Sequence, residues 1–198
     1  MTTTDTGRPP TLDGCPVPGL RYVANWIAPE TAARLLSTID GETWASPLRR
    51  RVQHYGHRYD YGSRNVDSEP APALPVWAGD LATRLLDEGF TDNPTEQVIV
   101  NEYLPGQGIS AHIDSVAQFG PVVAAISLGS RCVMDFGHLD SPAKVSVPLE
   151  PNSLCVMAGD ARYRWRHAIA ARKTDPGPSG RIPRQRRVSV TFRTLAAG

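Results

Sequence analysis

QVIVNEYLPGQGISAHID, residues 97–114, is the stretch that decides the fold class, because short strand-like segments replace helical ones from this point onward. It opens with an alternating, β-branched run and then passes through a glycine-containing turn. Two earlier segments, 29–40 and 74–90, have apolar residues at helical spacing. This order predicts an α+β domain, with helices against one face of an antiparallel sandwich or jelly roll. The later strand-like segments are 121–128, 131–136, 144–149, 153–159, 163–169 and 187–193.

Turn residues refine this prediction. Pro29 lies at the start of the first helix, and Gly89 lies near the end of the second. Gly129 and Ser130 form a two-residue hairpin signal, which predicts that the strands on either side pair. Residues 45–75 have no steady period and are too long for a simple connector, so we expect a lid or binding loop there. A second loop is expected at 172–185.

The composition limits the class of protein. The 198 residues suffice for one domain with a substantial core, and 18 prolines with 17 glycines indicate many turns rather than a helical bundle. The net charge of +1 excludes a global field that would draw the protein onto nucleic acid or a membrane. Arginines still gather locally, where they either follow a phosphate backbone or solvate loops. Their clusters are Arg49, Arg50 and Arg51, then Arg162, Arg164 and Arg166, then Arg181, Arg184, Arg186 and Arg187.

The N-terminus and the cysteines predict the cellular setting. Residues 1–18 are polar and lack the apolar stretch of a signal peptide, so we expect a mobile tail and then a single domain over 19–198. No apolar run approaches the length of a membrane span. Cys132 and Cys155 lie in apolar runs outside any CxxC pattern, as expected of buried free thiols in a reducing cytosol. We therefore expect a cytoplasmic monomer without membrane contact.

His112 and Asp114 are candidate metal ligands. Residues two apart on a strand point to the same face, so these side chains would converge at the end of one strand. His167 follows on a later segment, which we expect to lie across the barrel mouth. Two histidines and one carboxylate form the facial triad of non-heme Fe(II) oxygenases, which leaves sites for a bidentate keto acid and for dioxygen. A bare HxD match is common in surface loops, and only the surrounding motifs argue for a site here.

Arg187 and Arg193 are candidate anchors for a dicarboxylate. They lie six residues apart on the last strand-like segment and so share one face, with solvent exposure as the alternative. A guanidinium can hold a carboxylate with two parallel hydrogen bonds, whereas an unpaired arginine on a core strand would be costly. Asn101 and Tyr103 alternate along the first strand and could donate to the same ligand, and Ser189 shares the face of Arg187. Together with the triad, these residues predict an iron enzyme that consumes 2-oxoglutarate.

The motifs follow the order NxY, HxD, a distant His and RxxxxxR, which resembles the AlkB family of Fe(II)/2-oxoglutarate dioxygenases from about Arg50 to Leu195. The likeness is strongest to the branch that contains the oxygenase domain of the eukaryotic AlkB homologue that modifies the wobble uridine of tRNA. The resemblance implies a double-stranded β-helix with N-terminal helices and a nucleotide-recognition lid over about 45–75. The stretches that carry it are RRVQHYGHRYDY, NEYLPGQGISAHID, SLGSRCVMDF and SLCVMAGDARYRWRH.

The resemblance also implies roles for individual residues, with two departures from the family pattern. Val116 stands where the bacterial prototype has a second Asp two residues after its metal Asp, which counts against a DNA-repair substrate. Ser189 stands where the family often has Asn, which weakens Ser189 as a cofactor contact. The implied assignments are Fe(II) on His112, Asp114 and His167, the distal carboxylate of 2-oxoglutarate on Arg187 and Tyr103, and the proximal carboxylate near Arg193 and Asn101.

The expected reaction follows from the same resemblance. The family typically oxidises a methyl group on a base nitrogen, after which formaldehyde leaves, so demethylation of alkylated bases in DNA or RNA is implied. Alternatives are a tRNA-modifying hydroxylase, a hydroxylase of a protein or small molecule, and a catalytically silent nucleic-acid-binding module. A base must be flipped or single-stranded to reach the metal, and it would stack on aromatic side chains. The candidate substrate contacts, which could instead pack an outer sheet edge, are Tyr55, His57, Arg58, Tyr59 and Tyr61.

Overall fold

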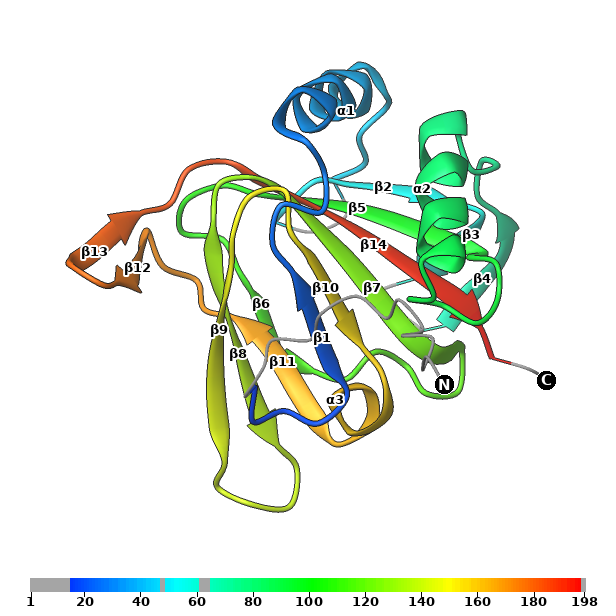
Figure 1. Cartoon of the computed structure of the whole chain (residues 1–198). Coiled ribbons are helices and arrows are strands. Elements are labelled where there is room, and N and C mark those ends of the chain that lie inside the picture. Colours follow the sequence, from blue (N-terminus) through cyan, green and yellow to red (C-terminus); the bar gives the residue numbers. More distant parts are fainter. Residues whose placement is uncertain (1–14, 47–48, 61–64, 197–198) are drawn as a thin grey trace, which may run out of the picture.

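Two antiparallel sheets face each other within residues 15–46, 49–60 and 65–196, which the computed structural model describes (Figure 1). The larger sheet has the strand order β1-β10-β7-β14-β5-β2, and the smaller one has the order β6-β11-β8-β9. This pair of sheets is the predicted double-stranded β-helix, or jelly roll. The larger sheet consists of β1 (Leu20–Val23), β2 (Val52–Tyr55), β5 (Gln97–Tyr103), β7 (Phe119–Gly129), β10 (Leu154–Met157) and β14 (Arg187–Leu195). The smaller sheet consists of β6 (Ile109–His112), β8 (Cys132–His138), β9 (Lys144–Leu149) and β11 (Trp165–Ile169).

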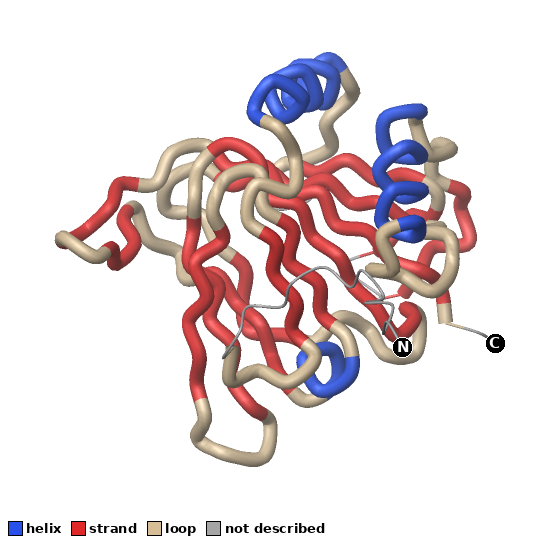
Figure 2. Tube along the Cα trace, in the orientation of Figure 1, coloured by secondary structure: helices blue, strands red, loops and turns tan. Residues whose placement is uncertain are grey.

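Two helices cover the outer face of the larger sheet, as the ribbon and tube views show (Figures 1 and 2). They are α1 (Pro29–Gly41) and α2 (Val76–Asp87), and a short α3 (Gly159–Tyr163) connects β10 to β11. None of the helices in the described part of the chain has the length and apolar character needed to cross a membrane. Two small hairpins complete the structure, β3 (His57–Asp60) with β4 (Asn65–Pro70), and β12 (Thr174–Gly177) with β13 (Gly180–Pro183).

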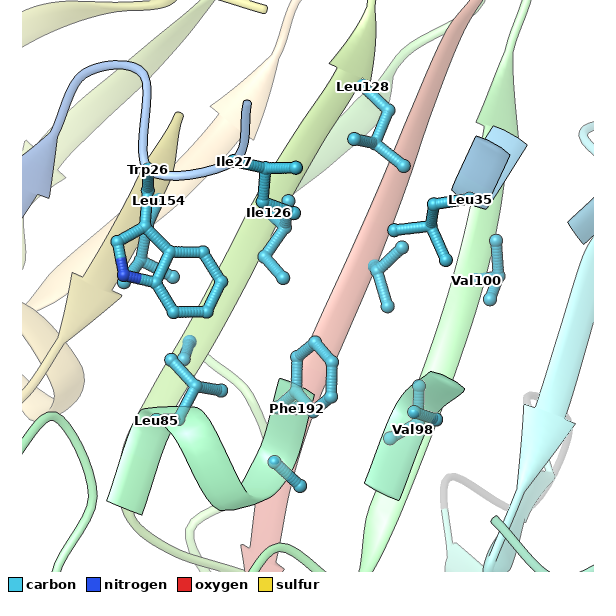
Figure 3. Packing of buried hydrophobic residues seen from close by; sticks show 14 of the residues in the cluster. Trp26, Ile27, Leu35, Leu85, Val98, Val100, Ile126, Leu128, Leu154 and Phe192 are labelled. Carbon is cyan, nitrogen blue, oxygen red and sulfur yellow. The ribbon is translucent and has the colours of Figure 1, made fainter. Parts of the chain in front are cut away.

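The last strand, β14, separates two different environments. Because neighbouring residues on a strand point to opposite sides, Val188, Val190 and Phe192 pack into the apolar layer beneath the helices. Arg187 and Arg193 point the other way, into a pocket between the sheets. Figure 3 shows the helix-facing layer, where apolar side chains of the helices meet those of the sheet. One face of β14 thus builds the core, and the other supplies polar groups to the interior.

A second apolar cluster lies between the sheets and receives side chains from β1, β7, β8, β9, β10 and β11. Val17, inside the segment expected to be a mobile tail, is buried in this cluster. Packing therefore begins before residue 19, while residues 1–14 of the expected tail lie outside the described residues.

Cys132 and Cys155 are buried free thiols, as predicted. Burial raises the pKa of the Cys155 thiol to about 12, so this thiol stays protonated at neutral pH.

The hairpin predicted at Gly129 and Ser130 is wrong. β7 ends at Gly129 in the larger sheet, and β8 begins at Cys132 in the smaller one, so the chain crosses between the sheets. A tight turn is nevertheless present, because Gly129 has a φ of +81° and a Cβ there would lie 2.6 Å from the carbonyl oxygen of Arg186. The sequence signal of a turn is the same whether the next strand joins the same sheet or the opposite one.

The segment 172–185, expected to be a loop, contains the β12–β13 hairpin, which projects from the body of the molecule (Figure 1). A buried ion pair ties it down. The Asp175 carboxylate accepts hydrogen bonds from Arg184 Nε at 2.6 Å and Nη2 at 2.8 Å, and from Arg172 Nε at 2.8 Å. Arg184 Nη1 also donates to the carbonyl of Ala170 at 2.8 Å. The pair therefore links the hairpin to the chain that leaves β11.

Replacing Asp175 by Asn is expected to lower the free energy of unfolding by about 3–5 kcal/mol, because Arg184 would stay buried without its counter-charge. Burial alone would raise the pKa of Asp175, but the hydrogen bonds from Arg184 and Arg172 outweigh it and hold that pKa below its usual value. The pair therefore stabilises the fold above about pH 4, where the unfolded-state carboxyl is ionised, and its contribution is lost as the pH falls through the folded-state pKa.

Urea unfolding at pH 7 measures this loss, and Asp140→Asn is the matched control. The carboxylate of Asp140 is exposed and pairs with Arg164 at 2.6 Å, so that ion pair contributes about 1 kcal/mol or less. Equal losses for the two variants would contradict the role given to the Asp175 pair.

Candidate active site

The three predicted metal ligands come together in the pocket between the sheets. His112 ends β6, and His167 on β11 is its direct partner in the register of the smaller sheet. Asp114 lies two residues later, in the loop after β6. One ligand atom from each residue lies within 4.8 Å of the other two. His167 is thus on the neighbouring strand rather than across the barrel mouth, a correction that depends on a strand pairing the sequence does not reveal.

Hydrogen bonding and burial set the charges of these ligands. His112 Nδ1 lies 2.8 Å from the carbonyl oxygen of Ser110, and because a carbonyl only accepts, Nδ1 carries a proton and Nε2 is the ring nitrogen available to a metal. Burial lowers the pKa of His167 to about 4, so its ring is neutral at pH 7. Burial alone would raise the pKa of Asp114, but the charge and the hydrogen bond of Arg193 outweigh it and keep the carboxyl ionised. Two imidazoles and one carboxylate fit Fe(II).

Every residue predicted to hold 2-oxoglutarate lines the same pocket. The adjacent strands β5 and β14 supply them, with Tyr103 opposite Arg187 and Asn101 opposite Ser189. Metal ligands and carboxylate anchors therefore share one cavity. Apart from Thr191, the rest of the lining is apolar, and it consists of Ile109, Val123, Ala125, Met134, Met157 and Ile169.

Arg187 has unused hydrogen-bonding capacity in this pocket. The residue is 3% exposed, and its Nη2 donates to Ser127 Oγ at 2.8 Å. Its guanidinium carbon lies 5.5 Å from the centre of the Tyr103 ring. Among the residues that the structure describes, Nε and Nη1 of Arg187 are buried without a hydrogen-bond partner. Buried donors left unpaired are costly, and a carboxylate would accept from this group in matching geometry. The pocket therefore fits a dicarboxylate such as 2-oxoglutarate.

Arg193 acts on a metal ligand directly. Its Nη2 donates to Asp114 Oδ1 at 3.1 Å, and its Nη1 donates to Gln97 Oε1 at 3.0 Å. The guanidinium carbon lies 4.8 Å from the centre of the Phe119 ring. Arg193 thus orients one carboxylate oxygen of Asp114 and stabilises its charge, as outer-shell partners of metal ligands do.

Sequence reasoning missed two residues that support these arginines. Ser127 on β7 accepts a hydrogen bond from Arg187, and Gln97 on β5 accepts one from Arg193. Extending the alternation of Asn101 back along residues 97–103 would have placed Gln97 on the same face of β5 as Asn101 and Tyr103. Ser127 had no comparable signal, because its contact depends on the pairing of β7 with β14.

Two arginines of the cluster at 49–51 contact neighbouring residues of β5. Arg50 Nε donates to Asn101 Oδ1 at 2.9 Å, and its guanidinium carbon lies 5.6 Å from the centre of the Tyr103 ring. Arg51 forms a two-hydrogen-bond ion pair with Glu102, at 2.6 Å and 2.8 Å. These contacts with β5 differ from both roles expected for the cluster, which were to follow a phosphate backbone or to solvate loops.

The predicted substrate contacts are placed differently. Tyr55 is buried in the helix-facing core, where its ring meets that of Trp77 edge-on at 5.9 Å, so the packing alternative holds for this residue. His57 begins β3 and does not line the pocket. The predicted lid at 45–75 contains β2, β3 and β4, and its residues 47–48 and 61–64 lie outside the described residues. The side chains that the structure does not describe include those of Arg58, Tyr59 and Tyr61.

Comparison with known proteins identifies the family. The model of the 2OG-Fe(II) oxygenase superfamily matches residues 19–193. ALKBH8 of Macaca fascicularis, named tRNA (carboxymethyluridine(34)-5-O)-methyltransferase, is 40% identical over 167 residues, which cover 80% of this chain and 25% of that protein. The Alkylated DNA repair protein ALKBH8 homolog of Arabidopsis thaliana is 32% identical over 203 residues, which cover 90% of this chain and 59% of that protein.

The chain thus spans a quarter of the first relative and about three fifths of the second. The solved structure of OsALKBH1 shares the fold, with a TM-score of 0.71 over 89% of this chain and 97% of that chain at 16% identity. The chain therefore belongs to the 2OG-Fe(II) oxygenase superfamily, and within it to the AlkB family of 2-oxoglutarate-dependent dioxygenases near the ALKBH8 branch.

Proposed function

We propose that the chain removes a methyl group from a base nitrogen of DNA or RNA by oxidation, using Fe(II), 2-oxoglutarate and dioxygen. One observation carries the proposal: His112, Asp114 and His167 share a pocket with Arg187, whose Nε and Nη1 have no hydrogen-bond partner in the described chain. A metal alone would need only the first three residues, whereas the arginine calls for a carboxylate co-substrate. Fe(II) bound with 2-oxoglutarate supplies the oxidation of a substrate C–H bond by dioxygen, with succinate and CO₂ as co-products.

The chain's own residues hold and orient these groups. Nε2 of His112 and the neutral ring of His167 offer nitrogen ligands, and the ionised carboxylate of Asp114 offers an oxygen. Arg187 takes the distal carboxylate of 2-oxoglutarate, with Tyr103 beside it. The apolar lining of the pocket limits access of bulk water to this group, which strengthens every charged hydrogen bond inside.

Membership in the AlkB family supports a nucleic-acid substrate. The pocket opens between two sheets, so a base would have to come from a single strand or be flipped out of a duplex to enter it. Arg49 and Arg166 are exposed, and side chains of this type contact phosphates without reading sequence.

A second candidate is stable hydroxylation of a wobble-uridine substituent in tRNA, favoured by the 40% identity with ALKBH8. Because the match covers 25% of that relative, its methyltransferase activity is not part of this proposal. Val116 is 55% exposed on the loop after Asp114. It stands where the bacterial prototype has an acidic residue, which also argues against a DNA-repair substrate. The two candidates differ in product, since demethylation releases formaldehyde and hydroxylation leaves the oxygen on the substrate.

Mass spectrometry of nucleic acid incubated with the protein, Fe(II), 2-oxoglutarate and air tests both candidates. One reaction contains an N-methylated single-stranded oligonucleotide, another contains tRNA, and succinate is measured in each. Loss of methyl matched by succinate and formaldehyde is the result we expect, and oxygen gained by tRNA would establish the second candidate instead. Succinate without change in either nucleic acid would contradict both substrates while leaving the oxygenase assignment intact.

A further inference from the structure

Arg162 makes an unusual set of contacts for an arginine in a cluster expected to solvate loops or bind phosphate. It lies on α3 and is 2% exposed. Its guanidinium donates four hydrogen bonds, all to backbone carbonyl oxygens of one short segment. The acceptors are the carbonyls of Asp114 at 2.8 Å, Ser115 at 3.2 Å, Phe119 at 3.2 Å and Gly120 at 3.2 Å.

These acceptors span the loop that carries the carboxylate ligand. Asp114 lies beyond the last residue of β6, and β7 begins only at Phe119, so sheet pairing does not hold the intervening residues. Within the loop, the Phe119 N–H donates to the Ser115 carbonyl at 3.0 Å. Arg162 donates to the carbonyl oxygens of Ser115 and Phe119, the two ends of this turn.

The position of Arg162 also couples two ligands. α3 ends two residues before β11, the strand on which His167 sits. One continuous segment therefore presents His167 to the pocket and holds the backbone of Asp114, while β6–β11 pairing fixes His112 opposite His167. A change in the direction of the Arg162 side chain would therefore move the backbone of Asp114 relative to His167.

We propose that Arg162 is a positioning residue of the metal site, which sets the direction of the Asp114 carboxylate by clamping the backbone of its loop. It acts from the main-chain side, and Arg193 acts at the carboxylate itself. The inference rests on the proposed function, since it takes His112, Asp114 and His167 as the metal ligands.

The chemistry of the side chain suits this role. A guanidinium has five N–H groups in one rigid plane, and three separate nitrogens of Arg162 are used here. A lysine has a single nitrogen and cannot reach acceptors at both ends of the loop with the same geometry. Burial lowers the pKa of Arg162, and its attraction to the ionised Asp114 offsets part of that effect, while four carbonyl oxygens accept its hydrogen bonds.

The test compares binding of Mn²⁺, a stable substitute for Fe(II), to metal-free wild type and to Arg162→Met and Arg162→Lys. Free Mn²⁺ is measured by electron paramagnetic resonance well below the melting temperature of each protein. Loss of an outer-shell partner typically weakens metal affinity about 10–100-fold, and we expect that increase in Kd for Arg162→Met and a smaller one for Arg162→Lys. Arg164→Met is the control, because Arg164 is exposed and pairs with Asp140, and its Kd should equal that of wild type.

A merely structural role would give a different pattern. Both Arg162 variants would then melt at lower temperature but bind Mn²⁺ with wild-type affinity, and that result would overturn the inference. If Arg162→Met does not fold, Arg162→Lys alone decides between the two patterns. Absence of Mn²⁺ binding by the wild type would instead overturn the proposed function, on which the inference rests.

Discussion

Replacing His112 by Ala is expected to abolish succinate formation while leaving the fold intact. The variant loses one of three metal ligands, so the fall in activity should exceed the roughly 10–100-fold cost of losing an outer-shell partner. The side chain of His112 is 34% exposed, and its polar contacts among the described residues are with the Ser110 carbonyl and with Asp114. Truncating it therefore removes little packing, and the melting temperature of the metal-free protein should hardly change.

Succinate release and thermal melting of the same preparations measure the two effects separately. His138→Ala is the matched control, because His138 lies on the same sheet at the end of β8, and its ring hydrogen-bonds within its own turn, at Asp140 and Ser141, and meets the Trp165 ring edge-on at 5.1 Å. Wild-type turnover by His112→Ala would refute the metal assignment. A comparable loss of succinate formation in His138→Ala would show that removing a histidine from this sheet lowers activity by disturbing the fold.

Replacing Arg187 by Met should eliminate 2-oxoglutarate binding without destabilising the free protein. The ligand would lose charged hydrogen bonds that contribute about 1.5–3 kcal/mol each, and two such bonds correspond to roughly 10²- to 10⁴-fold in Kd. The free protein loses the bonds of Arg187 to Ser127 and Ser189 and its contact with the Tyr103 ring, and it is relieved of a buried cation with two nitrogens that lack a partner among the described residues. Its melting temperature should therefore equal or exceed that of wild type.

Thermal melting with and without 2-oxoglutarate provides the measurement. A ligand at a hundred times its Kd stabilises a protein by about 2.7 kcal/mol, so wild type should shift and Arg187→Met should not. Arg181→Met is the control, since Arg181 is an exposed arginine of the same cluster that donates to Thr174. A full ligand-induced shift in Arg187→Met would remove this residue from the 2-oxoglutarate site.

The individual strands could be predicted from the sequence far better than their pairing. The bounds expected for residues 97–103 and 144–149 are those of β5 and β9, because alternating β-branched residues are a local signal. The partner of each strand is a long-range property. For that reason the sequence predicts a hairpin at Gly129 that the structure does not contain, and it does not predict the pairing of β6 with β11.

The site divides along the same line. The residues that the structure brings together in the pocket, His112, Asp114, His167, Arg187 and Arg193, could be picked out because residue type and spacing along the chain single them out. Ser127 and Arg162 could not, since one depends on register between β7 and β14 and the other on backbone acceptors in a distant loop. Tyr55 shows the converse error, because its aromatic ring suits base stacking and core packing equally well, and only its burial against Trp77 decides between them.

We infer that one pocket binds Fe(II) and 2-oxoglutarate together. Anaerobic titration of Fe(II) into the protein with 2-oxoglutarate tests this joint binding, because a keto acid chelated to Fe(II) gives a visible charge-transfer absorption. We predict a band that saturates at one Fe(II) per chain, requires 2-oxoglutarate, and disappears in both His112→Ala and Arg187→Met. No band in the wild type, or an unchanged band in both variants, would contradict the binding of Fe(II) and 2-oxoglutarate in this pocket.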